Sequence, residues 1–256
     1  MLKAQRFDAI RDVLKKHPYI ALHHLIKQLP ISRETLRRDL IEMENMQIIK
    51  RVHGGVMRID AEPDLAVREK MQIREKQNIA KAALGYLHSG DVIFVDAGST
   101  TAIFLEQLSQ LSDMTIITNS LSAAMNLKRM FSAQNINNVV HLLGGELLLD
   151  TSATYGVNTL LEIDHFHADL VIFSPVGLHH HFGATCFYSQ EGAVVRAMVK
   201  NARQVMVLSD DSKWSTVSHF QMCTLDEIDI LITNAGVEDQ PDFQLIKETI
   251  QQVIIA

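Results

Sequence analysis

Six short apolar segments in the last two thirds of the sequence constrain the fold more than any other feature. They read DVIFVD (91–96), MTIITN (114–119), VVHLLGG (139–145), DLVIFS (169–174), QVMVLSD (204–210) and DILIT (229–233). Each is short, rich in branched residues and apolar at successive positions, which is typical of a parallel strand buried on both faces. Helical patterns at about 99–111, 120–132 and 189–201 lie between several of them. The sequence therefore predicts an α/β domain with a mainly parallel sheet.

Small polar residues follow four of these predicted strands. Ligands of such sheets bind outside the carboxyl ends of the strands, where loops meet the N-termini of helices. Hydroxyls, free backbone N–H groups and a lysine ammonium all suit a phosphate group. One such turn is common in α/β proteins, so the prediction rests on the four together. The residues at these four strand ends include Asp96, Gly98, Ser99, Thr100, Thr101, Asn119, Ser120, Gly144, Gly145 and Lys213.

The first 60 residues differ in charge from the rest of the chain. They hold 12 basic and 7 acidic side chains, whereas the whole chain holds 24 Lys and Arg against 30 Asp and Glu. A short basic segment joined to a longer acidic one indicates a module that binds a polyanion, attached to a domain with another partner.

Three short amphipathic helices are predicted within this basic segment. Apolar residues recur at helical spacing over residues 3–16, and again from Leu22 to Leu29, before Pro30. Ser32 is a good N-cap for a third helix that runs to about Asn45. Arg33, Thr35, Arg37 and Arg38 lie off its apolar stripe, near its N-terminal end. A helix, a short turn and a second helix with polar first turns predict a helix-turn-helix that reads double-stranded DNA.

The segment IIKRVHGGVMRI after the third helix predicts a β-hairpin wing. Two apolar and basic stretches flank His53-Gly54-Gly55, where the glycines permit a tight turn. Lys50, Arg51 and His53 would face the DNA backbone, as would Arg58. The candidate DNA contacts are therefore Ser32, Arg33, Thr35, Arg37, Arg38, Lys50, Arg51 and His53.

The motifs resemble those of the DeoR family of bacterial transcriptional regulators. The pattern Ser32-x-x-Thr35-Leu36-Arg37-Arg38-Asp39-Leu40 resembles the family's helix-turn-helix signature, and KRVHGGV resembles its wing. DAGSTT, TNSL, LLGGEL and SDDSKW stand in the family's order and resemble its C-terminal effector domain, which is similar to ribose-5-phosphate isomerases. The resemblance implies that the strand-end residues given above are effector contacts, and it adds Glu191 to them. Pro30, Gln47 and Pro175 depart from the family's pattern.

The motifs divide the chain into three parts. We expect a winged helix-turn-helix domain over residues 1–60, a linker over 61–76, and an effector-binding and oligomerisation domain over 77–256. A single charged helix is expected at about 67–87.

Other features narrow the class of protein. The charged opening MLKAQRFDAIRD is unlike a signal peptide, and no stretch reaches the roughly 18 apolar residues of a membrane span. Cys186 and Cys223 form no CxxC, so we expect a cytoplasmic protein with no membrane partner. His179-His180-His181 invites a metal interpretation, but no cysteine or carboxylate stands at ligand spacing. We therefore expect no metal, no cofactor and no catalytic residue.

Two functions remain. One is a transcriptional regulator, a repressor of a carbohydrate or nucleoside catabolic operon that leaves its operator when a phosphorylated sugar binds. The other is a sugar-phosphate isomerase-like enzyme that carries a DNA-binding head. Because helix-turn-helix proteins read repeated half-sites, we also expect a homodimer or homotetramer.

Overall fold

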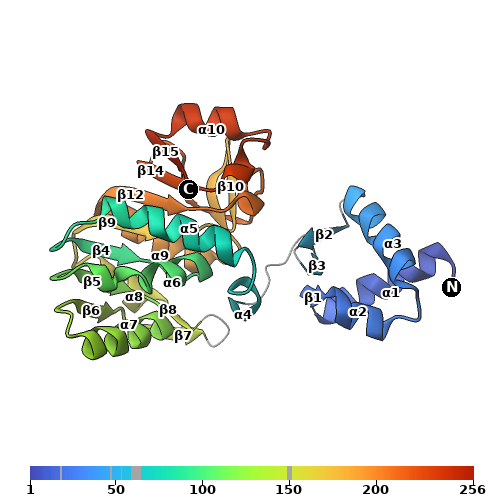
Figure 1. The fold of residues 1–256 in the computed structure, drawn as a ribbon, viewed down its shortest axis with the longest axis horizontal. Coiled ribbons are helices and arrows are strands. Elements are labelled where there is room, and N and C mark those ends of the chain that lie inside the picture. The colour runs from blue at the N-terminus through green and yellow to red at the C-terminus, as the bar shows by residue number, and fades with distance from the viewer. Residues whose placement is uncertain (18, 47, 53, 59–64, 149–151) are drawn as a thin grey trace. The chain divides into compact units, whose positions relative to one another are not determined.

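The computed structural model describes residues 1–17, 19–46, 48–52, 54–58, 65–148 and 152–256. Contacts divide the chain into two compact units, an N-terminal unit Met1–Met71 and a C-terminal unit Gln72–Ala256 (Figure 1). Within the described residues, none of the helices combines the length and the apolar character that crossing a lipid bilayer requires.

The N-terminal unit contains the three predicted helices and a small antiparallel sheet in the strand order β1-β3-β2. Its elements are α1 Lys3–Lys16, β1 Tyr19–Ala21, α2 Leu22–Gln28, α3 Arg33–Asn45, β2 Ile49–Val52, β3 Gly55–Arg58 and α4 Leu65–Arg68. The predicted hairpin is confirmed, since β2 and β3 pair with Ile49 opposite Arg58. Strand β1 was not predicted; it is only three residues long and is held by its pairing with β3.

An ion pair supports the core of this unit. Leu36 and Leu40 of α3 are buried in the same apolar cluster as Ile10 of α1. Beside that cluster, the guanidinium of Arg6 meets the buried carboxylate of Asp39 through two hydrogen bonds of 2.5 and 2.8 Å. This two-point geometry fixes orientation as well as distance. Asp39 therefore serves to hold α3 against α1.

The C-terminal unit is built on a seven-stranded sheet in which every neighbouring pair is parallel, so the prediction of a mainly parallel sheet is confirmed. The strand order is β15-β14-β12-β9-β4-β5-β6. The strands are β4 Val92–Val95, β5 Thr115–Thr118, β6 Val139–Leu142, β9 Ala168–Phe173, β12 Ala202–Leu208, β14 Ile230–Thr233 and β15 Gln252–Ile255.

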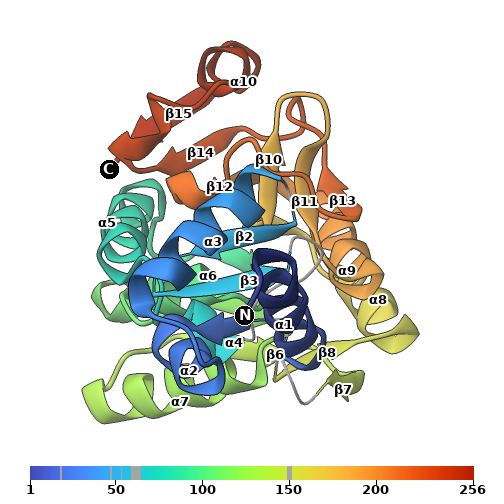
Figure 2. The same ribbon diagram turned by 90° about the vertical axis from the view of Figure 1, so that its right-hand side faces the viewer.

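Helices cover both faces of this sheet (Figure 2). Alternate strand residues enter opposite cores: Ile93 and Val95 face one apolar cluster, and Phe94 faces the other. Because both faces of the inner strands are buried, these strands are apolar at nearly every position. The edge strand β6 differs from the prediction, since its Val139 and Leu142 are exposed. One face carries α5 Ile73–Ala83, α6 Ser99–Leu105 and α7 Leu121–Gln134, and the other carries α8 Val157–Ile163, α9 Ser189–Lys200 and α10 Phe243–Thr249.

Several short elements complete the unit. One small antiparallel sheet pairs β7 Glu146–Leu148 with β8 Ala153–Tyr155. In another, β11 Gly183–Cys186 lies between β10 Gly177–His179 and β13 Phe220–Cys223. Single 3₁₀ turns lie at Leu84–Tyr86, Leu108–Gln110, Asp211–Lys213 and Ala235–Val237.

The single helix expected at 67–87 is wrong. The chain forms the short α4, a turn, and then α5, which ends at Ala83. Gln72 adopts φ 50° and ψ 39°, a left-handed conformation that interrupts a right-handed helix. This break coincides with the division between the two units.

Candidate DNA-binding and effector sites

The start of α3 presents its polar side chains as a recognition helix requires. Ser32 caps the helix, because its hydroxyl accepts a hydrogen bond of 3.2 Å from the Thr35 backbone N–H. The two hydroxyls of Ser32 and Thr35 also lie 2.8 Å apart. Arg33, Arg37 and Arg38 are exposed.

Glu34 forms only weak ion pairs with Arg37 and Arg38. Its Oε1 lies 3.1 Å from Arg38 Nε and 3.9 Å from Arg37 Nη1, and all three side chains are exposed. Exposed pairs of this kind contribute between about 0 and 1 kcal/mol. Both guanidinium groups can therefore exchange Glu34 for a phosphate or a base edge at little cost.

The wing adds basic side chains from β2. Arg51 is exposed and pairs with Glu44 of α3, with 3.5 Å between Nη1 and Oε2, while Lys50 is half-buried. Gly55 is required by packing, because an added Cβ would lie 2.4 Å from the ring of Tyr19. His53 lies outside the described residues.

The topology of the C-terminal unit marks one place for a ligand, the carboxyl ends of the strands where the strand order reverses, and we call this place the crevice. From β4 the chain runs outward through β5 to β6, and it then returns to the other side of β4 to form β9, β12, β14 and β15. The order therefore reverses between β4 and β9. In open α/β sheets the carboxyl ends of the strands at such a reversal are where ligands bind.

A chain of polar contacts crosses this crevice. Lys213 Nζ donates to Ser174 Oγ at 2.6 Å, and Ser174 Oγ donates to Thr100 Oγ1 at 3.2 Å. Next to Thr100, Ser99 accepts from Lys76 Nζ at 3.0 Å. Two ammonium groups and three hydroxyls thus gather from α5, the β4–α6 turn, the end of β9 and the turn after β12.

Two residues in this series of polar contacts, Lys76 and Ser174, are not among the ligand contacts predicted from the sequence. Ser174 was visible as the polar last residue of DLVIFS, at the end of a predicted strand. Lys76 gave no signal, because it stood among many charged residues of an expected linker.

Other predicted contacts shape the β4 turn. Thr101 Oγ1 donates to the carbonyl oxygens of Asp96 and Gly98, at 2.7 and 3.0 Å. Asn119, at the end of β5, accepts from the Ala97 N–H at 2.9 Å and so ties two strand ends together. The Asp96 side chain is buried at the carboxyl end of β4.

The remaining predicted contacts lie on other segments. Ser120 caps α7, accepting from the Ala123 N–H at 3.2 Å. Gly145 lies after β6 with φ 144°, and an added Cβ would lie 2.1 Å from Thr159 Oγ1, so packing against α8 accounts for this glycine. Gly144 precedes it and is exposed, and Glu191 lies half-buried in the first turn of α9.

The turn after β12 is rigid. Asp210 is almost fully buried, and its Oδ1 accepts from the Ser212 N–H at 3.1 Å. Asp211 exchanges two hydrogen bonds of 2.8 Å with the side chain of Asn234. These contacts fix the backbone that carries Lys213.

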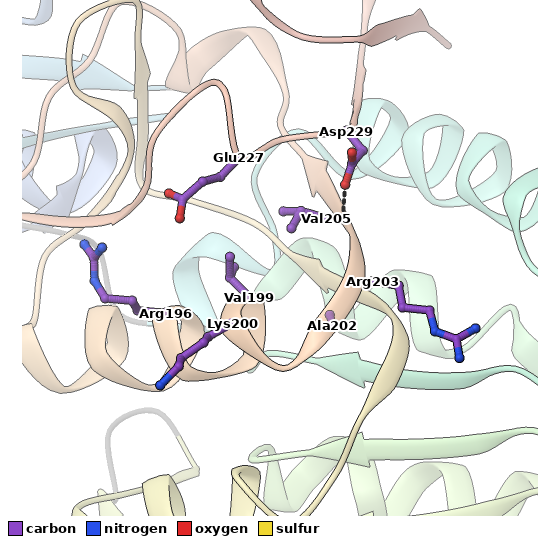
Figure 3. A pocket seen from close by; sticks show the side chains of 8 residues that line it. All are labelled: Arg196, Val199, Lys200, Ala202, Arg203, Val205, Glu227 and Asp229. Carbon is purple, nitrogen blue, oxygen red and sulfur yellow. Dashed lines mark hydrogen bonds between the residues drawn. The ribbon is translucent and has the colours of Figure 1, made fainter.

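A pocket of about 420 Å³ lies at the opposite, amino ends of β12 and β14 (Figure 3). Several of its polar groups already have structural partners: Arg203 pairs with Asp169 at 3.3 Å, and Asp229 accepts from the Val205 N–H at 2.7 Å. We prefer the crevice at the carboxyl ends, because its cations and hydroxyls come from several elements and converge.

Two histidines and an aspartate form a cluster with the ligand types of a metal site. Ligand atoms of His179, His180 and Asp242 lie within 4.8 Å of one another, and Asp242 is the carboxylate that the sequence did not reveal. However, His179 Nδ1 accepts from the His181 N–H at 3.1 Å, which leaves the proton of the neutral ring on Nε2, facing Asp242 at 3.6 Å. A metal ligand would need the reverse arrangement. We interpret the cluster as a link between the β10–β11 hairpin and the start of α10.

Burial and charge set the titration of this cluster. Burial lowers the pKa of His179 below its ordinary 6.5, although Asp242 opposes the effect. Burial alone would raise the pKa of Asp242, but hydrogen bonds from His180 and the imidazole charges outweigh it and lower that pKa.

Comparisons with known proteins identify the class. Residues 6–62 match the DeoR-like helix-turn-helix domain, and residues 71–235 match the DeoR C terminal sensor domain. The chain therefore belongs to the DeoR family of transcriptional regulators, as its motifs predicted.

Particular relatives align over nearly the whole chain. The HTH-type transcriptional repressor GlcR of Bacillus subtilis (strain 168) is 32% identical over 237 residues, which cover 91% of this chain and 89% of that protein. The glycerol-3-phosphate regulon repressor of Escherichia coli (strain K12) is 29% identical over 241 residues, covering 92% of each. A solved structure, ribose 5-phosphate isomerase A from Methanocaldococcus jannaschii, is 20% identical with a TM-score of 0.36 and covers 54% of this chain and 53% of that one. That structural likeness is too weak to support a functional argument.

We predict that Arg37→Ala and Arg38→Ala each weaken binding to a DNA duplex enriched by the full chain from a random-sequence library. Removing one phosphate contact should reduce the slope of log affinity against log salt by about 1, and removing a base contact should cost about 1–3 kcal/mol. The measurement is fluorescence anisotropy over a series of salt concentrations. Lys128→Ala, which removes an exposed cation of α7, is the control. Unchanged affinity in both arginine variants would contradict the assignment of α3.

We predict opposite effects on acid stability from two changes in the histidine cluster. A histidine whose pKa is lower in the folded protein than in the unfolded chain stabilises the folded state at a pH above its ordinary pKa. This stability is lost as the pH falls below the ordinary pKa. Asp242→Asn should lower the His179 pKa further and steepen the loss of thermal stability between about pH 7 and 5, whereas His179→Asn should flatten it. Asp242 itself titrates at lower pH. The fluorescence of Trp214, the only tryptophan, reports unfolding of this unit; parallel pH profiles in the three proteins would contradict the account.

Proposed function

We propose that this protein is a transcriptional repressor that leaves its operator when a phosphorylated sugar binds between the carboxyl ends of β4, β9 and β12. The observation that carries the proposal is the chain of contacts from Lys213 through Ser174 to Thr100, with Ser99 and Lys76 beside it. These groups come from separate segments and meet where the strand order reverses.

The chemistry of the crevice suits a phosphate ester. Ammonium groups and hydroxyls donate to phosphate oxygens, and a phosphate monoester carries up to two negative charges near neutral pH. The Asp96 carboxylate, buried at the end of β4, is an acceptor for a sugar hydroxyl in this proposal. A free sugar would lack the anion that the two lysines favour.

The names of the relatives are consistent with this proposal. One is a repressor of a glycerol-3-phosphate regulon, and another is described as a repressor. Regulation of a carbohydrate or nucleoside catabolic operon remains our expectation for this chain. In this proposal the protein acts in the cytoplasm. Binding to paired half-sites would require a homodimer or homotetramer.

The alternative, an isomerase with a DNA-binding head, requires a base next to a substrate carbon and a pKa suited to proton transfer. The polar groups of the crevice are instead held by hydrogen bonds among themselves, which suits binding without turnover. Isomerisation of a sugar phosphate by the purified protein would favour the enzyme.

We predict that a phosphorylated sugar raises the unfolding temperature of the C-terminal unit and that Lys213→Met abolishes this shift. Binding only to the folded state stabilises it by about 2.7 kcal/mol at a ligand concentration of 100 times Kd. Trp214 is buried beside Lys213, so its fluorescence follows this unit within the full chain. The probes are ribose 5-phosphate, glucose 6-phosphate, fructose 6-phosphate, deoxyribose 5-phosphate and glycerol 3-phosphate, with the unphosphorylated compounds beside them.

Lys128→Met serves as the matched control, because it removes an exposed lysine from the same unit. This variant should keep the full shift. A shift that survives Lys213→Met would place the phosphate elsewhere, and equal shifts with the unphosphorylated compounds would contradict recognition of the phosphate.

A further inference from the structure

Helix α5 begins where the C-terminal unit begins. Gln72 is the first residue of this unit and precedes α5 in a left-handed conformation. Lys76 lies in the first helical turns, and only 3% of its surface is exposed. A buried ammonium is costly unless polar groups surround it. The location of Lys76 therefore calls for a functional or structural reason.

Lys76 connects α5 to the crevice. Its Nζ donates to Ser99 Oγ, on the first residue of α6, at 3.0 Å. Ser99 adjoins Thr100, which accepts from Ser174. The Lys76 ammonium thus belongs to the same series of polar contacts as Lys213.

A second contact joins the same end of α5 to the turn that carries Lys213. Gln72 Nε2 lies 3.5 Å from Asp211 Oδ1, at the limit of a hydrogen bond. Asp211 and Lys213 belong to one 3₁₀ turn. The two ends of the crevice therefore both touch the first turns of α5.

We propose that Lys76 is a positioning residue that transmits occupancy of the crevice to the start of α5. An anion held by Ser99 and Thr100 competes for their hydroxyl groups and attracts the Lys76 ammonium, so the first turn of α5 has different contacts in the occupied and empty states. A ligand shifts an equilibrium only by such a difference in interaction. Because Gln72 follows Met71 directly, a change at this turn passes along the backbone into the N-terminal unit. This inference rests on the proposed function of the crevice.

The test separates ligand binding from DNA release in the full chain. Binding is measured by the Trp214 unfolding midpoint, and release by anisotropy of the enriched duplex. The probes are inorganic phosphate and the sugar phosphate that gives the largest midpoint shift. The variants are Lys76→Met, which keeps the length of the side chain, and Lys76→Arg, which keeps its charge. Lys81→Met, an exposed lysine of the same helix, is the control.

In the wild-type protein and in Lys81→Met, we expect the sugar phosphate to weaken duplex binding by about tenfold, within the usual range of coupling between sites. Release by Lys76→Met is measured relative to its own duplex affinity without ligand. Its midpoint should still rise at sufficient sugar phosphate, yet its duplex affinity should change less than about twofold. Lys76→Arg should restore part of the release.

Two results would overturn the proposal. In one, Lys76→Met releases the duplex as fully as the wild type at saturating ligand. In the other, Lys76→Met and Lys76→Arg both fold but show no midpoint shift at any ligand concentration, which would make Lys76 a ligand contact alone. Failure of the proposed function looks different, because the wild-type protein itself would then show neither a shift nor release.

Discussion

The pairing of β4 with β9 is the constraint on which the C-terminal unit depends. These strands are neighbours at the centre of the sheet although their paired residues are 77 positions apart in the chain, with Ile93 opposite Leu170 and Val95 opposite Ile172. The Asp96 N–H extends the ladder by donating to the Ile172 carbonyl at 3.1 Å. This register places the turn after β4 beside Ser174. Without it, the hydroxyls of α6 and the Lys213 turn would not share one crevice.

The turns that this pairing brings together suit a sensor domain. The crevice draws its polar groups from turns that are each fixed by local hydrogen bonds, such as those of Asp211 with Asn234. Rigid turns lower the cost of ordering the site on binding. What remains free to respond is the contact made by α5, which comes from outside the sheet. We therefore assign recognition of the ligand to the turns and the conformational response to α5.

Much of the architecture follows from local patterns in the sequence. The inner strands were predicted because both of their faces are covered, which leaves an apolar residue at nearly every position. The expectation that VVHLLGG is also buried on both faces is wrong, because β6 lies at the edge of the sheet and is largely exposed. Ser32 and the arginines of α3 were predicted because a cap and an apolar stripe are local features. β15 was missed, since QVII at the end of the chain gains its place only by pairing with β14.

The missed elements depend on contacts between distant segments. The break at Gln72 has no proline or glycine to mark it, so the charged run seemed to continue as one helix. Lys76 could not be assigned to the crevice, because its meeting with Ser99 results from the packing of α5 on α6, 23 residues along the chain. Asp242 likewise reaches the histidines only through the fold. Strand ends were therefore predictable, whereas side chains contributed by neighbouring helices were not.

The most direct measurement of the central claim is the affinity of the wild-type full chain for its enriched duplex, titrated with a sugar phosphate and separately with the corresponding free sugar. The account predicts that one sugar phosphate weakens duplex binding by about tenfold and that its free sugar leaves it unchanged. Equal duplex affinity with and without every sugar phosphate, or release by the free sugar, would contradict it.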